Sequence, residues 1–246
     1  MTISRSDRAT LSSHPPARVA RFDRLERAVH WCNATLFGVV MLTGAALYAG
    51  PLSTLVGRRE LVRTLHVYAG LGLPLPLLAG VLLRSGRQLR ADLRTLNRWI
   101  PDDFRWLRTR GRDPRVRLGK FNPGQKLNAT FIGAVIVVML ATGSIMHWFG
   151  PFPNDWRTGA TFVHDWFAIA LFFVVLGHIW IALADPVALR GMTGGSVTGA
   201  WARTHRPRWY DEVTGVNGGT GVNGVNTASD ATTDDHARAE VAPGDR

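Results

Sequence analysis

The sequence predicts an all-α protein, a four-helix transmembrane bundle with its N- and C-termini in the cytoplasm. Two observations predict the bundle: the chain of 246 residues contains four long apolar segments, and none of them contains Lys or Arg. A third observation, the unequal distribution of Lys and Arg between the connecting loops, predicts the orientation. A bilayer core about 30 Å thick requires roughly 20 apolar residues in a helix, and each segment approaches that length.

The four expected spans cover residues 30–49, 65–83, 127–149 and 161–184. Asp165 is the one carboxylate inside them. Pro74 and Pro76 interrupt the second span, but neighbouring helices in a membrane bundle tolerate such interruptions. A buried bundle in a soluble protein is the alternative. Soluble helices usually have one apolar stripe and a polar back, whereas these segments are apolar all round.

Positive charge indicates which loops lie in the cytoplasm. Residues 84–126, between the second and third spans, contain 13 Lys and Arg residues, whereas the connection after the third span contains only Arg157. Because short basic loops stay on the cytoplasmic side, we expect a multi-pass inner-membrane protein with this loop and both termini inside. Contact with membrane lipid then accounts for the net charge of +11, and no nucleic acid partner is expected.

The two ends of the chain differ in composition from the part between them. Residues 1–20 form a polar, basic arm, and residues 214–246 form a tail rich in Gly, Asn, Thr and Asp. We expect both to be disordered, because they contain too few apolar residues to form a core. Residues 21–213 are therefore the expected four-span domain. The arm has no apolar stretch typical of a signal peptide, and the single cysteine, Cys32, excludes an internal disulfide framework.

An ionisable side chain within a span indicates a functional site. His147, at the outer end of the third span, has no evident partner at its depth, but four other histidines lie within or beside the expected spans. His164 and His178 share the fourth span, and helix geometry places them on nearly the same face, about 21 Å apart along the axis. His30 starts the first span at its cytoplasmic side, and His66 starts the second span at the opposite side. Depth therefore pairs His66 with His164 near the outer surface, and His30 with His178 near the inner surface.

Two histidine pairs at two depths of a four-helix bundle are typical of two haem b groups, each held between two imidazoles. Bundle cores hold cofactors through side chains on facing helices. Two axial nitrogens leave no open position on the iron, which favours electron transfer. A zinc site fits poorly, because the sequence has no H-E-x-x-H motif and the four histidines lie at two levels. For any one histidine alone, an interhelical hydrogen bond is the alternative.

Five features of residues 21–213 carry a resemblance to a known family. They are RFDRLERAVHW from Arg21, LHVYAGL from Leu65, GKFNPGQK from Gly119, the two histidines of the fourth span, and WARTHRPRWYDEV from Trp201. With these motifs the sequence resembles the gamma subunits of respiratory formate dehydrogenases, which are membrane cytochromes b.

The resemblance implies a path for electrons. An iron–sulfur beta subunit would deliver them, two b haems would carry them across the membrane, and menaquinone or ubiquinone would accept them. His66 and His164 are implied as ligands of the outer haem, and His30 and His178 as ligands of the inner haem, in agreement with depth. A separate molybdenum-containing alpha subunit would oxidise formate, because this chain contains no molybdenum or iron–sulfur motif.

The resemblance also implies a quinone site beside the inner haem. The family's N-x-G-Q motif occurs here as Asn122, Pro123, Gly124 and Gln125, and His178 is implied to contribute from the fourth span. The amides of Asn122 and Gln125 can donate hydrogen bonds to a quinone carbonyl. The alternative is a helix start, with Asn122 as the N-cap and Pro123 as the first helical residue. The two uses are compatible.

Three other functions stay open at the level of the sequence. One is the diheme cytochrome b of another respiratory reductase or hydrogenase. The second is a free-standing superoxide:quinone oxidoreductase, which would need no partner subunit. The third is a membrane anchor without redox activity. The outer loops are too short to distinguish between these functions.

Overall fold

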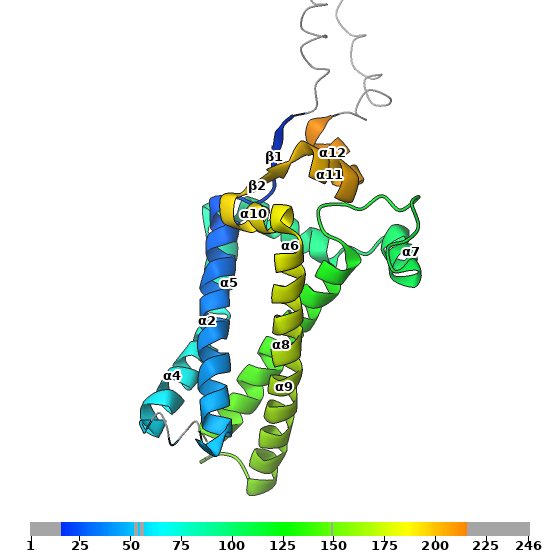
Figure 1. Ribbon diagram of the computed structural model, residues 1–246. Helices are drawn as coiled ribbons and strands as arrows, with labels where there is room; N and C mark the ends of the chain where they lie inside the picture. The colour runs from blue at the N-terminus through cyan, green and yellow to red at the C-terminus, as the bar shows by residue number, and fades with distance from the viewer. Residues whose placement is uncertain (1–15, 52–53, 55–56, 149, 216–246) are drawn as a thin grey trace, which may run out of the picture.

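The computed structural model of the chain describes residues 16–51, 54, 57–148 and 150–215. Most of these residues are helical, and four long apolar units run side by side as a bundle (Figure 1). The units are α2 (Arg24–Tyr48), α4 with α5 (Arg59–Gly72 and Leu75–Leu82), α8 (Pro123–His147) and α9 (Asn154–Ala184). In the bundle α2 packs against α4, and α8 packs against α9. Each unit is long and apolar enough to cross a membrane, which confirms the predicted helical bundle.

Local sequence signals decide where these units begin and break. The Asp23 side chain accepts from the Glu26 N–H at 2.7 Å, and the Glu26 carboxylate accepts from the Asp23 N–H at 2.7 Å. This capping box starts α2 at Arg24, earlier than the expected span, because the cap lies in the polar segment before the apolar run. Pro74 has no N–H to donate and separates α4 from α5. The second span therefore consists of two helices in series.

The outer surface of the bundle is apolar. Leu42 is 75% exposed, Leu82 is 83% exposed and Trp180 is 77% exposed. Soluble monomers rarely present such side chains over a large contiguous surface, whereas acyl chains cover them without cost. The exposed surface, together with the length of the helices, indicates a multi-pass membrane protein.

One end of the bundle carries the remaining described elements, and we call it the basic end. It contains the starts of α2 and α8 and the ends of α5 and α9 (Figure 1). The elements there are the 3₁₀ helix η1 (Arg84–Gly86), α6 (Arg87–Asn97), α7 (Pro101–Thr109), α10 (Pro186–Gly194), α11 (Gly199–His205), α12 (Pro207–Thr214), and the strands β1 (Arg18–Ala20) and β2 (Ser196–Thr198).

A two-stranded sheet joins the two ends of the described chain. β1 and β2 are antiparallel, with Val19 opposite Val197. These valines pack with Trp201, Trp209 and Tyr210 in a small core. The sequence predicted disorder up to residue 20. That prediction is wrong for β1, because the strand finds a pairing partner and an apolar core. Residues 1–15 and 216–246, which form most of the predicted arm and tail, lie outside the described residues.

Two buried lysines hold the start of α8 in this assembly. Lys120 is 7% exposed and lies between Glu26 of α2, at 3.4 Å, and Asp92 of α6. Lys126 is 3% exposed and lies 2.6 Å from Asp103 of α7. A buried charge is costly unless it is paired. These ion pairs therefore fix the polar segment between them, residues 121–125, against three neighbouring helices.

Candidate functional site

The structure brings together the two histidine pairs that depth predicts. The ring centroids of His30 on α2 and His178 on α9 lie 6.3 Å apart, with 52° between the ring planes. The centroids of His66 on α4 and His164 on α9 also lie 6.3 Å apart, at 65°. The first pair is toward the basic end, and the second is toward the opposite end. Among the described helices, neither α2 nor α4 packs closely against α9, so the imidazoles face each other across the space between the two helix pairs.

The separation of the rings fits one metal ion between each pair. Imidazole nitrogens bind metals at about 2 Å, and the ring centroid lies about 1 Å behind the nitrogen, so two opposed ligands place their centroids about 6 Å apart. In the part of the chain that the structure describes, no group of three or more His, Cys, Asp or Glu side chains could hold a metal ion. Zinc sites use three or four protein ligands. The observed pairs instead match the axial positions of a planar macrocycle.

Each histidine of the pair far from the basic end is oriented by a threonine on the neighbouring helix. His66 Nδ1 lies 3.0 Å from Thr43 Oγ1 and 3.1 Å from the Val40 carbonyl. His164 Nδ1 lies 3.0 Å from Thr142 Oγ1. Both hydroxyls donate back to their own helix, at 2.6 Å to Val39 O and 2.8 Å to Val138 O. The hydroxyls therefore accept from Nδ1–H, which leaves Nε2 of each histidine free to bind iron.

A glycine follows each of these threonines and gives the imidazole room. A Cβ atom added at Gly44 would lie 3.2 Å from His66 Cε1, and one added at Gly143 would lie 3.4 Å from His164 Cε1. Sequence reasoning missed the threonines as supporting residues. The signal was present, because the Thr-Gly dipeptide recurs in the first helix of each packed helix pair.

The other histidines of the spans are arranged differently. In the described chain, no hydrogen bond holds a ring nitrogen of His30 or His178, and His30 contacts the edge of Trp31 at 5.4 Å. His147 ends α8 and packs against Trp148 at 5.0 Å. It joins neither histidine pair.

The predicted quinone motif starts α8 at the basic end. Asn122 Oδ1 accepts from the Gln125 N–H at 2.8 Å, and Gln125 Oε1 accepts from the Asn122 N–H at 3.0 Å, with Gly124 in the turn between them. The expected helix start is therefore confirmed. Because both amide oxygens serve the cap, the two NH₂ groups are left as donors, and neither has an acceptor among the described residues. The structure gives no direct contact between this motif and His178.

Arg206 is a further residue at this motif that sequence reasoning missed. Its Nη2 donates to Gln125 Oε1 at 3.4 Å. Its guanidinium lies over Trp201, with 5.6 Å to the ring centroid. Both residues belong to WARTHRPRWYDEV, so this C-terminal motif contacts the N-x-G-Q motif in space although about 80 residues separate them in sequence. Only the three-dimensional structure reveals that contact.

Comparison with known proteins places these features in one family. The sequence profile described as prokaryotic cytochrome b561 matches residues 21–195. The chain belongs to the prokaryotic cytochrome b561 family. The match covers all four spans and both histidine pairs, and it ends before the C-terminal helices α11 and α12.

Relatives with established names are formate dehydrogenase subunits. The chain is 28% identical to the nitrate-inducible formate dehydrogenase cytochrome b556(Fdn) subunit of Escherichia coli K12, over 79% of this chain and 91% of that protein. It is 30% identical to the cytochrome b556(fdo) subunit of the same organism, over 79% and 93%. It is also 30% identical to the formate dehydrogenase cytochrome b556 subunit of Haemophilus influenzae, over 79% and 83%.

Membership in the cytochrome b561 family makes this chain a membrane electron-transfer protein that binds haem b. The paired imidazoles fit that group, because haem iron takes histidine nitrogens as axial ligands. When bound, haem supplies reversible one-electron chemistry at its iron. His30 with His178 and His66 with His164 would hold haem through their ring nitrogens, and the apolar helices around them would exclude water.

Proposed function

We propose that the chain is the cytochrome b subunit of a formate dehydrogenase complex and carries electrons from an iron–sulfur subunit through two b haems to a quinone. One observation carries the proposal: two histidine pairs with the same 6.3 Å separation occur at two levels of one bundle. The names of the most similar relatives support formate as the source of electrons. A molybdenum-containing subunit would oxidise it outside this chain.

Electrons enter at one histidine pair and leave at the other. The positive charge of the basic end supports a cytoplasmic location for it, so the outer pair is His66 with His164 and the inner pair is His30 with His178. Along α9 the two levels are about 21 Å apart. The bundle therefore carries each electron across most of the apolar thickness of the membrane.

Quinone accepts the electrons beside the inner pair. The NH₂ groups of Asn122 and Gln125 take no part in the cap that holds their oxygens, which suits donation to a quinone carbonyl. Protons for the reduced quinone come from the cytoplasm, whereas formate oxidation releases protons outside. Each electron that crosses inward moves against about 2.3 kcal/mol per 100 mV of membrane potential, and the reaction thereby conserves energy.

The main alternative is the cytochrome b of another respiratory reductase or hydrogenase, which the breadth of the cytochrome b561 description supports. A free-standing superoxide:quinone oxidoreductase would also use two haems. Purification of the chain from its native membrane distinguishes these functions. Copurification of a molybdenum subunit, together with formate-driven reduction of the b-type absorption band, is expected. Purification of the chain alone would contradict the proposed complex.

Substitution His178→Ala in the purified complex tests the arrangement of the two haems. We expect the haem content to fall from two per chain to one, because the inner pair loses an axial ligand. The remaining haem should still be reduced by formate, while quinone reduction is lost. The measurements are haem stoichiometry, the reduced-minus-oxidised spectrum and quinone turnover. His147→Ala is the matched control, since His147 joins neither pair, and it should retain both haems. Retention of both haems in His178→Ala would refute the ligand assignment.

A further inference from the structure

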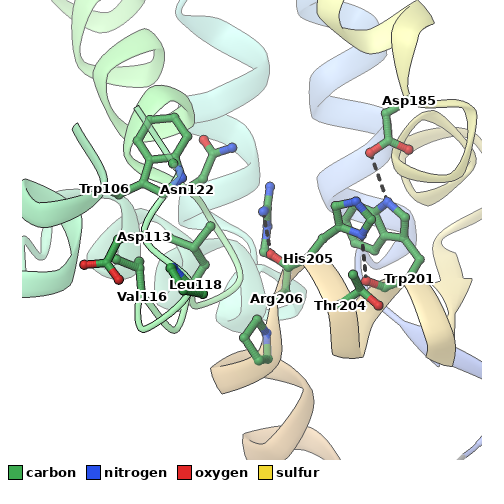
Figure 2. A pocket seen from close by; sticks show the side chains of 13 residues that line it. Trp106, Asp113, Val116, Leu118, Asn122, Asp185, Trp201, Thr204, His205 and Arg206 are labelled. Carbon is green, nitrogen blue, oxygen red and sulfur yellow. Dashed lines mark hydrogen bonds between the residues drawn. The ribbon is translucent and has the colours of Figure 1, made fainter. Parts of the chain in front are cut away.

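A cavity of about 430 Å³ lies at the basic end, outside the four spans (Figure 2). Its walls come from the loop after α7, the start of α8 and the helix α11. Trp106 and Asn122 line one side, Asp185 and Trp201 line the other, and Arg206 lies between them. The match to the cytochrome b561 profile includes Trp106, Asn122 and Asp185 but ends at residue 195, before Trp201 and Arg206.

Two buried guanidinium groups meet beside this cavity. Arg206 is 7% exposed and Arg21 is 4% exposed, and both lie over the ring of Trp201, at 5.6 Å and 4.9 Å. Burial lowers the pKa of each guanidinium to about 10, so both stay charged at neutral pH. Within the described residues neither forms an ion pair, and the Nε atom of each is buried without a hydrogen-bond partner. Buried charges without a counter-ion are costly.

The carboxylates at the cavity are already engaged. Asp185 accepts from the Ala188 N–H at 2.9 Å with one oxygen and from Trp201 Nε1–H at 2.9 Å with the other. Asp113 accepts from Arg115, at 3.0 Å and 3.1 Å. Asp185 lies close enough to favour the charged form of both buried arginines electrostatically. Asp92 also favours the charged form of Arg21, whereas Asp185 is the carboxylate beside Arg206 and already accepts two hydrogen bonds.

Arg206 retains capacity to bind an anion. A guanidinium has five N–H donors, and Arg206 uses one for the His205 carbonyl, at 2.8 Å, and one for Gln125 Oε1. Of the three that are left, the Nε–H is buried, so one N–H on each Nη nitrogen is free for a ligand in the cavity that Arg206 lines. A planar guanidinium binds phosphate through two parallel hydrogen bonds, which are stronger than hydrogen bonds between neutral groups.

We propose that this cavity binds a phosphate group, with the guanidinium of Arg206 as its charged ligand and Arg21 as a second positive charge behind it. Basic pockets at the cytoplasmic ends of membrane helices bind anionic lipid headgroups, and the cavity lies next to the ends of α8 and α9. The phosphate comes from an anionic phospholipid or from free phosphate in the cytoplasm. The site goes beyond the proposed electron transfer, although Asn122 lines the cavity and also belongs to the proposed quinone site.

The carboxylates of bound haem are the rival anion. His178 precedes Asp185 by seven residues, which corresponds to about 10 Å along a helix. The cavity wall formed by Asp185 therefore lies beyond the inner histidine pair, on the loop side. Haem content and midpoint potential distinguish the two anions, because only loss of a contact with the haem carboxylates would change them.

The test measures thermal unfolding of the intact, haem-loaded complex after delipidation. Inorganic phosphate is titrated at constant ionic strength, with sodium chloride as the balancing salt. In parallel, the complex is placed in nanodiscs of phosphatidylcholine with or without phosphatidylglycerol, and retained lipid is counted by native mass spectrometry. Arg206→Gln is compared with Arg203→Gln, which removes the same charge from an exposed position on α11, three residues before Arg206.

We expect the unfolding temperature of the wild type and of Arg203→Gln to rise with the phosphate-bearing probe, and Arg206→Gln to bind it about tenfold or more weakly. A response to phosphatidylglycerol alone assigns the lipid headgroup, and a response to inorganic phosphate assigns the soluble ion. If Arg206→Gln does not fold, Arg206→Lys, which keeps the charge but loses the planar fork, should bind more weakly than the wild type.

Two results would overturn the proposal. One is an equal response of the wild type and the Arg206 variants, or no response of the wild type to either probe. The other is a change in haem content or midpoint potential in Arg206→Gln without any phosphate or lipid response. That result would assign the guanidinium to the haem carboxylates.

Discussion

At the scale of single residues, the two histidine pairs differ in how their ring nitrogens are supported. His66 and His164 both direct Nδ1 toward a threonine hydroxyl, whereas no hydrogen bond in the described chain holds His30 or His178. A hydrogen bond from Nδ1–H makes imidazole a more basic ligand, and a more basic ligand favours ferric over ferrous iron. The outer site should therefore have the lower midpoint potential. In the proposed path, electrons would then move spontaneously from the outer site to the inner one.

Thr43→Val tests this difference. The substitution keeps the shape of the side chain but removes one of the two acceptors of His66 Nδ1–H, and only the Val40 carbonyl, at 3.1 Å, is left in the described chain. We therefore expect the midpoint potential of the outer haem to rise. One hydrogen bond of about 0.5–1.5 kcal/mol corresponds to about 20–60 mV for one electron. Redox titration of the b-type bands measures the shift. Thr35→Val on the same helix is the control, because Thr35 bonds only to its own helix at Trp31. Equal potentials in Thr43→Val and the wild type would contradict the role of the threonine.

At the scale of elements, an ion pair holds the start of α8 to α7. Lys126 Nζ donates to Asp103 Oδ2 at 2.6 Å and to the Arg98 carbonyl at 2.8 Å, and Asp103 also accepts from the Ile100 N–H at 3.0 Å. Both side chains of the pair are almost wholly buried. The spans themselves follow from apolar composition, and the sequence predicted them. This pair was not predictable, because no local pattern relates two charges on different helices.

Lys126→Met should destabilise the complex by about 3–5 kcal/mol, because it leaves the buried carboxylate of Asp103 unpaired. Lys126→Met combined with Asp103→Asn should recover much of that loss. Asn keeps an oxygen for the Ile100 N–H but carries no charge. Unfolding by denaturant in detergent measures the difference.

The matched control for this pair is a second ion pair, which lies within α7, the helix of Asp103. Arg105→Met breaks the more exposed pair with Asp102, at 3.2 Å, and exposed pairs contribute only about 0–1 kcal/mol. A loss in Lys126→Met no larger than in Arg105→Met would show that the buried pair does not hold α7 to α8.

At the scale of the whole molecule, the bundle repeats one arrangement. In each packed helix pair, a Thr-Gly dipeptide on the first helix supports a histidine on the second: Thr43 with His66, and Thr142 with His164. The histidine depths were predictable from the sequence because helix rise is constant. The layer formed by β1, β2, α11 and α12 was not, since its short elements owe their structure to contacts between the two ends of the described chain.

Which histidine pair holds the inner haem and which the outer haem depends on the orientation of the bundle in the membrane. The experiment uses a Cys32→Ser background, which removes the single cysteine. In that background, Arg112→Cys places a thiol in the exposed loop of the basic end, and Asp155→Cys places one at the exposed start of α9. If basic loops stay inside, a membrane-impermeant maleimide added to intact spheroplasts should label Asp155→Cys only. Arg112→Cys should react after lysis. The reverse pattern would place Asn122, Gln125 and the cavity of Arg206 outside the cell, where quinone reduction could not take up cytoplasmic protons.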